Sequence, residues 1–99
     1  MENTYEGWKK ECLDDLDIPK LWKDVSWSND VSPSFRTHNG FQVFIMEKDE
    51  AKRELEGVGR FIVQHYNYYG YDFAYRCFDD FNEVISYVNQ NTGAYIFKY

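Results

Sequence analysis

The chain has 99 residues and a formal net charge of −6 at pH 7, with a sequence pI near 4.8. A chain of this length is expected to form one domain, residues 1–99, that buries about 65% of its surface and needs no metal or disulfide to hold its core. The acidity argues against direct binding to nucleic acid, which depends on lysine and arginine at the phosphates. It fits a protein partner with a basic surface better.

Aromatic residues make up 20% of the chain, including nine tyrosines and eight phenylalanines. One small core should not need so many, so several are expected at the surface, where clustered aromatic side chains usually mark a binding site. The sequence has no run of 18 apolar residues, and its first residues lack the apolar stretch of a signal peptide. We therefore expect a cytoplasmic protein without membrane contact.

Two helices are predicted before the first strand. Residues 4–16 carry apolar side chains at three- and four-residue spacing, which is typical of a helix with one buried face. Pro19 suits the first turn of a second, short helix that ends near residue 24. Leu21 and Trp22 of this second helix are expected to pack inward.

A β-hairpin follows a loop in which Trp27 is expected to pin the chain to the core. Its strands are predicted at residues 34–38 and 41–46, joined by Asn39 and Gly40 as a two-residue type I′ turn, which needs φ > 0 at both positions. The second strand is apolar at five of its six positions, so both of its faces are expected to be covered.

The second half of the chain begins with a charged segment, residues 47–57, that has few apolar residues and is predicted to be an exposed loop with at most one helical turn. Two more strands are predicted at residues 60–66 and 71–78. Asp79 is expected to cap a final helix. Its apolar stripe consists of Phe81, Val84, Ile85 and Val88.

These elements predict an α+β fold. An antiparallel sheet of four to five strands has helices packed on one face, in the order α-α-β-β-β-β-α, with a short last strand possible at the end of the chain. No repeat, linker or low-complexity segment divides the sequence. A single domain is therefore expected.

The residues that could carry chemistry are few. His38 and His65 are the two histidines, and neither stands at a metal-ligand spacing. Cys12 and Cys77 are expected to be reduced thiols in or near the core. A Cys77–His65 nucleophile pair would need a positive setting, whereas acidic residues follow this cysteine. We expect no catalytic residue, no cofactor and no metal.

Two surface features are candidates for partner binding. The first is the acidic loop after the second strand, and the second is a tyrosine belt around the turn between the third and fourth strands. The candidate residues are Glu47, Asp49, Glu50, Glu54, Glu56, Tyr66, Tyr68, Tyr69 and Tyr71. Two further acidic clusters lie on the first helix, at Glu11, Asp14, Asp15 and Asp17, and at the start of the last helix, at Asp79, Asp80 and Glu83. The alternative interpretations are a solvated charged face and ordinary packing at strand ends.

The sequence resembles a group of small uncharacterised proteins from bacteria, phages and mobile elements. The matching stretches are WSND at residues 27–30 with Pro33, GFQVFI at 40–45, RFIV at 60–63 and DDFNEV at 79–84. In size, acidity and compact α+β build the chain is also similar to anti-CRISPR proteins, which bind host nuclease complexes and block them.

This resemblance implies a phage-type inhibitor that occludes the nucleic-acid-binding surface of a host defence complex. Such a protein presents negative charge to a basic cleft, in place of nucleic-acid phosphates. The alternative is a chromosomal interaction module or an immunity-type protein with an unrelated partner.

Overall fold

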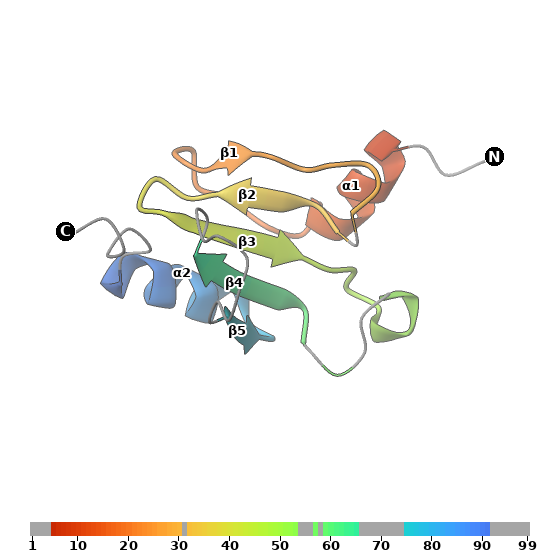
Figure 1. Cartoon of the computed structure of the whole chain (residues 1–99). Coiled ribbons are helices and arrows are strands. Elements are labelled where there is room, and N and C mark those ends of the chain that lie inside the picture. Colours follow the sequence, from red (N-terminus) through yellow and green to blue (C-terminus); the bar gives the residue numbers. More distant parts are fainter. Residues whose placement is uncertain (1–4, 31, 54–56, 58, 66–74, 92–99) are drawn as a thin grey trace.

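Figure 1 shows the computed structural model of the chain, which describes residues 5–30, 32–53, 57, 59–65 and 75–91. Within these residues, five strands form one antiparallel sheet in chain order, and the α+β prediction is confirmed. The elements are α1 (Tyr5–Leu13), β1 (Lys23–Asp24), β2 (Ser34–Arg36), β3 (Phe41–Ile45), the 3-10 turn η1 (Glu50–Lys52), β4 (Phe61–His65), β5 (Tyr75–Phe78) and α2 (Phe81–Gln90).

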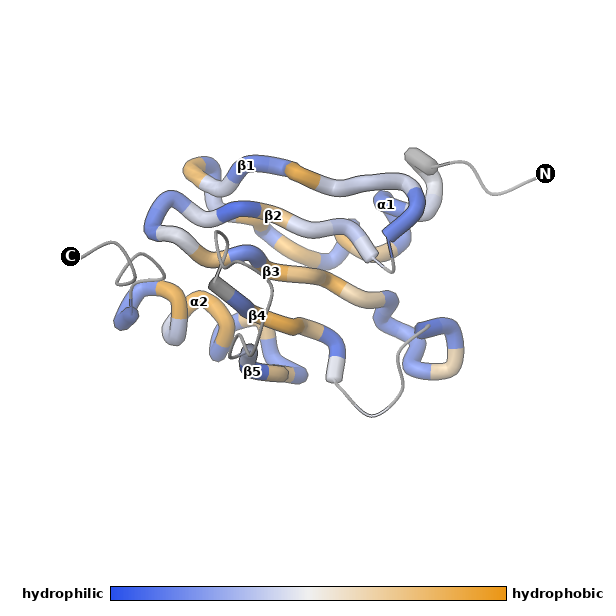
Figure 2. The backbone as a smooth tube through the Cα atoms, in the orientation of Figure 1, coloured by the Kyte–Doolittle hydropathy of each residue, from blue (hydrophilic) through white to orange (hydrophobic). Residues whose placement is uncertain are grey.

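The core lies on one face of this sheet. Side chains alternate along a strand, so Phe41, Val43 and Ile45 of β3 share a face, and each is at most 1% exposed. Val84 and Val88 of α2 are fully buried against the same cluster. The leucine at the end of α1 also packs there, so both helices serve this face. Apolar residues concentrate along β3, β4 and α2, whereas the η1 region is mostly hydrophilic (Figure 2).

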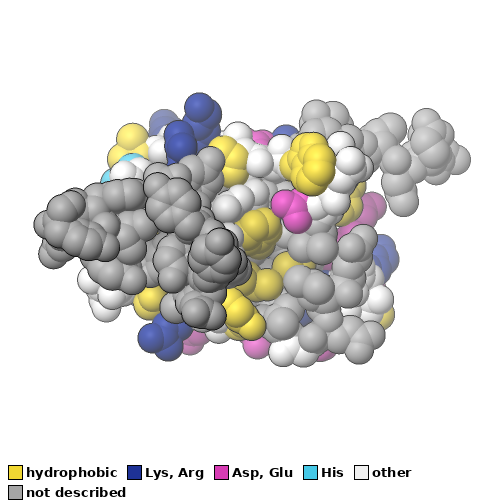
Figure 3. Space-filling model, in the orientation of Figure 1, with side chains coloured by type: hydrophobic (Ala, Val, Ile, Leu, Met, Phe, Trp, Pro, Cys, Tyr) yellow, Lys and Arg dark blue, Asp and Glu magenta, His cyan; other side chains and the backbone are white. Residues whose placement is uncertain are grey.

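The opposite face of the sheet, which we call the outer face, is only partly covered. The strand register places Phe44, Ile62 and Cys77 in one row across β3, β4 and β5. Phe44 and Ile62 are half-buried and Cys77 is exposed. Hydrophobic side chains reach the surface over β3 and β4 in Figure 3. The expectation that both faces of the second hairpin strand are covered is therefore wrong for the outer face.

The hairpin between β2 and β3 is confirmed, but its turn differs from the predicted one. Thr37 pairs with Phe41 (N–H to O, 2.8 Å), and Gly40 N–H donates to Thr37 O at 3.4 Å. The loop thus has three residues rather than two. Gly40 has φ 100°, which suits the left-handed residue that closes a three-residue hairpin loop. The Asn39 amide donates to Val88 O (2.7 Å) and Asn91 O (3.1 Å), so Asn39 ties the turn to the end of α2.

This geometry supports a test of the turn. Gly40→Val should lower the free energy of unfolding by about 2 kcal/mol, because a β-branched residue at positive φ is strained. His38→Val, in the same loop at an exposed position, should change it by less than about 0.5 kcal/mol. Urea melts of the two variants measure the difference. Equal free energies of unfolding for the two variants would mean that the residue with positive φ lies elsewhere in the loop.

The predicted second helix is wrong. Residues 19–22 form a turn, in which Trp22 N–H donates to Pro19 O at 3.1 Å, and β1 then pairs with β2. Trp22 reaches the core as expected, whereas Leu21 is 71% exposed. Trp27 does not pin its loop, because 62% of its surface is exposed. Pairing with a strand more than ten residues away overrides the weak helix signal of Pro19.

The start of α2 also differs by one residue from the prediction. Asp80, not Asp79, caps the helix, and its carboxylate accepts a hydrogen bond from Asn82 N–H at 2.9 Å. Asp79 Oδ1 instead accepts from Arg60 N–H at 3.3 Å. Gly59, with φ 80°, lies so close to the end of β5 that a Cβ added to it would stand 3.0 Å from Phe78 O. The chain entering β4 is therefore packed directly on the end of β5.

Candidate functional site

The structure brings two acidic segments together that lie far apart in the sequence. Glu11 and Asp14 at the end of α1 and Glu47 and Asp49 after β3 line one open hollow of about 220 Å³. Lys48 and Lys52 also line it. We call these six residues the acidic hollow. Among the described lining residues, four carboxylates against two ammonium groups give a net negative charge at neutral pH.

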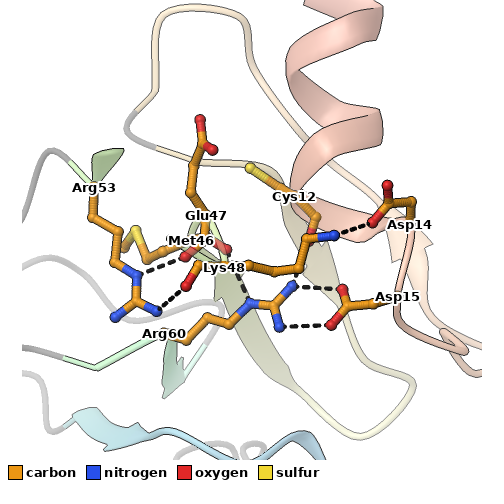
Figure 4. A network of polar contacts seen from close by, with 8 residues as sticks. All are labelled: Cys12, Asp14, Asp15, Met46, Glu47, Lys48, Arg53 and Arg60. Carbon is orange, nitrogen blue, oxygen red and sulfur yellow. Dashed lines mark hydrogen bonds and ion pairs between the residues drawn. The ribbon is translucent and has the colours of Figure 1, made fainter. Parts of the chain in front are cut away.

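Arg60 fixes the end of α1 against the sheet. Its guanidinium donates two hydrogen bonds to the Asp15 carboxylate, at 2.9 and 2.7 Å, and a third to Cys12 O at 2.8 Å. Its Nε donates to Met46 O at 3.2 Å (Figure 4). Arg60 is only 9% exposed, so its bonds to Cys12 O and Met46 O are shielded from water, whereas the Asp15 carboxylate is partly exposed. This bidentate geometry belongs to arginine and is not reproduced by lysine.

The segment after β3 is held by polar contacts rather than by apolar packing. Arg53 donates to Glu47 O at 2.6 Å and to Lys48 O at 3.1 Å, which closes the loop around η1. Lys48 Nζ lies 2.6 Å from Asp14 Oδ1 and joins the loop to α1 (Figure 4). The Asp49 carboxylate caps η1 by accepting from Ala51 N–H at 3.0 Å. Over its described residues the segment is a loop with one 3-10 turn, as predicted, and Glu47, Asp49 and Glu50 stand on a defined backbone.

The ionisable groups near the hollow respond to this arrangement. Burial, with Glu47 adding to it, raises the pKa of the Cys12 thiol to about 11, so the thiol is neutral at pH 7. The hydrogen bond from Arg60 lowers the pKa of Asp15, and the hydrogen bond to Asp14 raises the pKa of Lys48. Asp15 and Lys48 are therefore charged at neutral pH, and Cys12 is not a nucleophile there.

The predicted partner-binding residues are placed as follows. Glu47 is half-buried, and Asp49 and Glu50 are exposed. The remaining candidates lie outside the described residues: Glu54, Glu56, Tyr66, Tyr68, Tyr69 and Tyr71. Glu11 and Asp14 join the loop acids, although their cluster on the first helix carried no separate binding role in the sequence. Only their position beside the loop in the structure indicates a binding role for them.

The structure also locates the groups considered for catalysis. Cys12 is buried as expected, but Cys77 is exposed on the outer face, because β5 is the last strand among the described residues. Its strand partner is Ile62, whereas His65 pairs with Phe41 on the other side of β4. Burial, with Asp79 adding to it, raises the pKa of Cys77. His38 is exposed beside the hairpin turn.

The described part of the chain contains no group of three or more His, Cys, Asp or Glu side chains placed to hold a metal ion. None of its helices is long and apolar enough to cross a membrane.

Comparison of the chain with protein-family models, with curated proteins and with solved structures gives no match. What the protein binds must therefore be inferred from its own surface.

Proposed function

We propose that this protein is a small acidic inhibitor or adaptor that binds a basic surface of a protein partner. In its most concrete form it is a phage-type, anti-CRISPR-like protein that occludes the nucleic-acid-binding surface of a host nuclease complex. The observation that carries the proposal is the acidic hollow, where α1 and the segment after β3 present carboxylates side by side.

The polar network favours this use of the acids. Arg60 and Arg53 fix the backbone on both sides of the hollow, so the carboxylates are positioned before a partner arrives. A pre-positioned surface loses less conformational freedom on binding than a flexible one. Negative charge on such a surface speeds association with a basic cleft and disfavours acidic partners.

The first experiment asks whether the protein competes with nucleic acid. The tagged protein is used to capture partners from extract of a bacterial host, and each captured protein is purified. Its binding to nucleic acid is then titrated with and without the acidic protein. Under the proposal, the acidic protein displaces the nucleic acid. If the partner binds the acidic protein and nucleic acid at the same time, the result supports the alternative, an interaction module with an unrelated partner.

The second experiment assigns the surface by charge reversal. Glu50→Lys and Glu11→Lys, both at exposed positions, should each slow association with that partner about three- to tenfold at low salt. The loss should shrink at 0.5 M salt, because exposed charges are screened beyond a few Å. A double variant, Asn89→Lys with Gln90→Lys, makes the same change in net charge at exposed positions in the last turn of α2, away from the hollow, and is the matched control. An equal loss in all three variants would mean that only net charge matters.

A further inference from the structure

A second hollow, of about 420 Å³, lies between the chain just after α1 and the start of α2. One wall has Asp15, Leu16 and Asp17, and the other has Asp80, Phe81, Asn82 and Ile85. Among the described residues, its lining combines apolar side chains with three carboxylates and contains no lysine or arginine. We call it the α1–α2 hollow.

The apolar wall of this hollow comes from the apolar stripe of α2, which extends beyond the residues that are fully buried in the core. Val84 and Val88 are fully buried, whereas Phe81 and Ile85 are half-buried and face the hollow. Phe81 is held in place by ring contacts with Trp22 and Phe61, at centroid distances of 5.8 and 5.4 Å. The hollow therefore has a fixed apolar wall that the described residues leave partly uncovered.

The carboxylates are fixed as well. Asp15 is held by Arg60, and Asp80 is held by its cap on α2. Arg60, Lys48 and the positive end of the α2 dipole are cationic features near these acids. Arg60 is already bonded to Asp15, the helix end to Asp80, and Lys48 to Asp14. Asp17 is exposed and adds a third negative charge. The remaining field in the hollow favours a cation over an anion.

We propose that the α1–α2 hollow receives an arginine side chain from the basic surface of the partner, an inference that rests on the proposed function and names a contact within it. An arginine carries an apolar stem, which can lie along Leu16 and Ile85, and a planar cation, which can pair with Asp17 and lie against the Phe81 ring. A purely apolar segment would leave the carboxylates facing it without a partner, and an anionic ligand would be repelled.

The test uses the full chain and short peptides of defined charge. A tri-arginine peptide amide is titrated into the protein and followed by backbone amide NMR shifts, alongside a peptide with the central arginine replaced by citrulline, its neutral counterpart. The arginine peptide should shift amides of residues 15–17 and 80–85. The citrulline peptide should bind about three- to fivefold more weakly. Equal binding of the two peptides would overturn the proposal, because charge would not be recognised.

Two variants separate this hollow from general acidity. Asp17→Asn should weaken the arginine peptide about two- to fivefold, whereas Glu11→Gln in the acidic hollow makes the same charge change and should have less effect. Ile85→Ala should weaken it about threefold with no change in charge, because stem contact is lost. If the Ile85→Ala variant does not fold, Ile85→Val is measured in its place. Equal effects of Asp17→Asn and Glu11→Gln, with none at Ile85, would mean that the peptide senses only net charge.

The outcomes distinguish this inference from the function on which it rests. If a captured partner loses its nucleic acid but its affinity is unchanged by Asp17→Asn and by Ile85→Ala, the arginine contact is wrong and the proposed function stands. If no partner is displaced from nucleic acid but the arginine peptide binds as described, the hollow is a cation site and the proposed function is wrong.

Discussion

Phe41→Ala should lower the free energy of unfolding by about 3–5 kcal/mol. Phe41 is the first residue of β3 and is 1% exposed, and its ring lies 5.6 Å from that of Tyr87 on α2. Truncation removes this contact and leaves a cavity between the sheet and the helix. Domains of this size are stable by about 5–15 kcal/mol, so the variant should be close to unfolding at 37 °C.

Phe44→Ala is the matched control, because it removes the same side chain from the same strand on the opposite face. Phe44 is half-buried, so its loss should cost about 1–2 kcal/mol. Denaturant melts of the two variants give both values. Since a shift of one residue in register would exchange the two faces, a larger loss at Phe44 would show that the strand alternation is reversed.

Arg60→Met should lower the free energy of unfolding by about 3 kcal/mol. The substitution keeps an unbranched stem but removes the guanidinium, and with it the donors to Cys12 O, Met46 O and the Asp15 carboxylate. Loss of one partner of a buried ion pair typically costs about 3–5 kcal/mol. Here the lower end applies, because the Asp15 side chain is 39% exposed and water can solvate it once Arg60 is gone.

Arg53→Met is the control for this substitution, since its guanidinium also bonds two backbone carbonyls but lies on the loop around η1. Its removal should cost about 1 kcal/mol. Equal losses in the two variants would mean that Arg60 does not anchor α1. The Arg60 variant should also lose affinity for a partner of the acidic hollow, because α1 would no longer be fixed beside the loop.

The same ion pair predicts a pH dependence with a defined sign. Arg60 holds the pKa of Asp15 below its usual 3.8, so the folded state binds this proton less readily than the unfolded state. The stabilisation is fully present above about pH 4 and is lost as the pH falls through the lowered value. The stability difference between the wild type and Arg60→Met should therefore be constant from pH 5 to 7 and should shrink below pH 4. A difference that does not change at low pH would mean that Asp15 contributes nothing to it.

Several elements of the fold were predictable because their signals are local. Short runs rich in apolar residues indicated β3 and β4, and the apolar stripe before Asn91 indicated α2. The hairpin was predictable from Asn39 and Gly40, although the length of its loop was not. A three-residue loop and a two-residue loop use the same pair of residues. The choice between them is made by the bond from Gly40 to Thr37 and by the contact of Asn39 with α2.

The predictions for the second helix and for Trp27 are wrong. β1 has only two residues, Lys23 and Asp24, and it is a strand because β2 lies beside it, not because of its own composition. Trp27 was expected to pin its loop to the core, but 62% of its surface is exposed, whereas Trp22 packs in the core cluster. Short-range propensity carries little information where a distant neighbour decides the conformation.

The candidate site shows the same division between sequence and tertiary structure. By itself the sequence determined the acidic character of the chain, the charged segment after β3 and the acidic end of α1. Only the tertiary structure decided that these two segments share a hollow, and that the chain just after α1 lies opposite the start of α2. The contact responsible joins Arg60 to Asp15 across 45 residues of chain. A pairing of that separation leaves no periodic or local trace in a single sequence, because its free energy comes from burial and geometry that exist only once the sheet has formed.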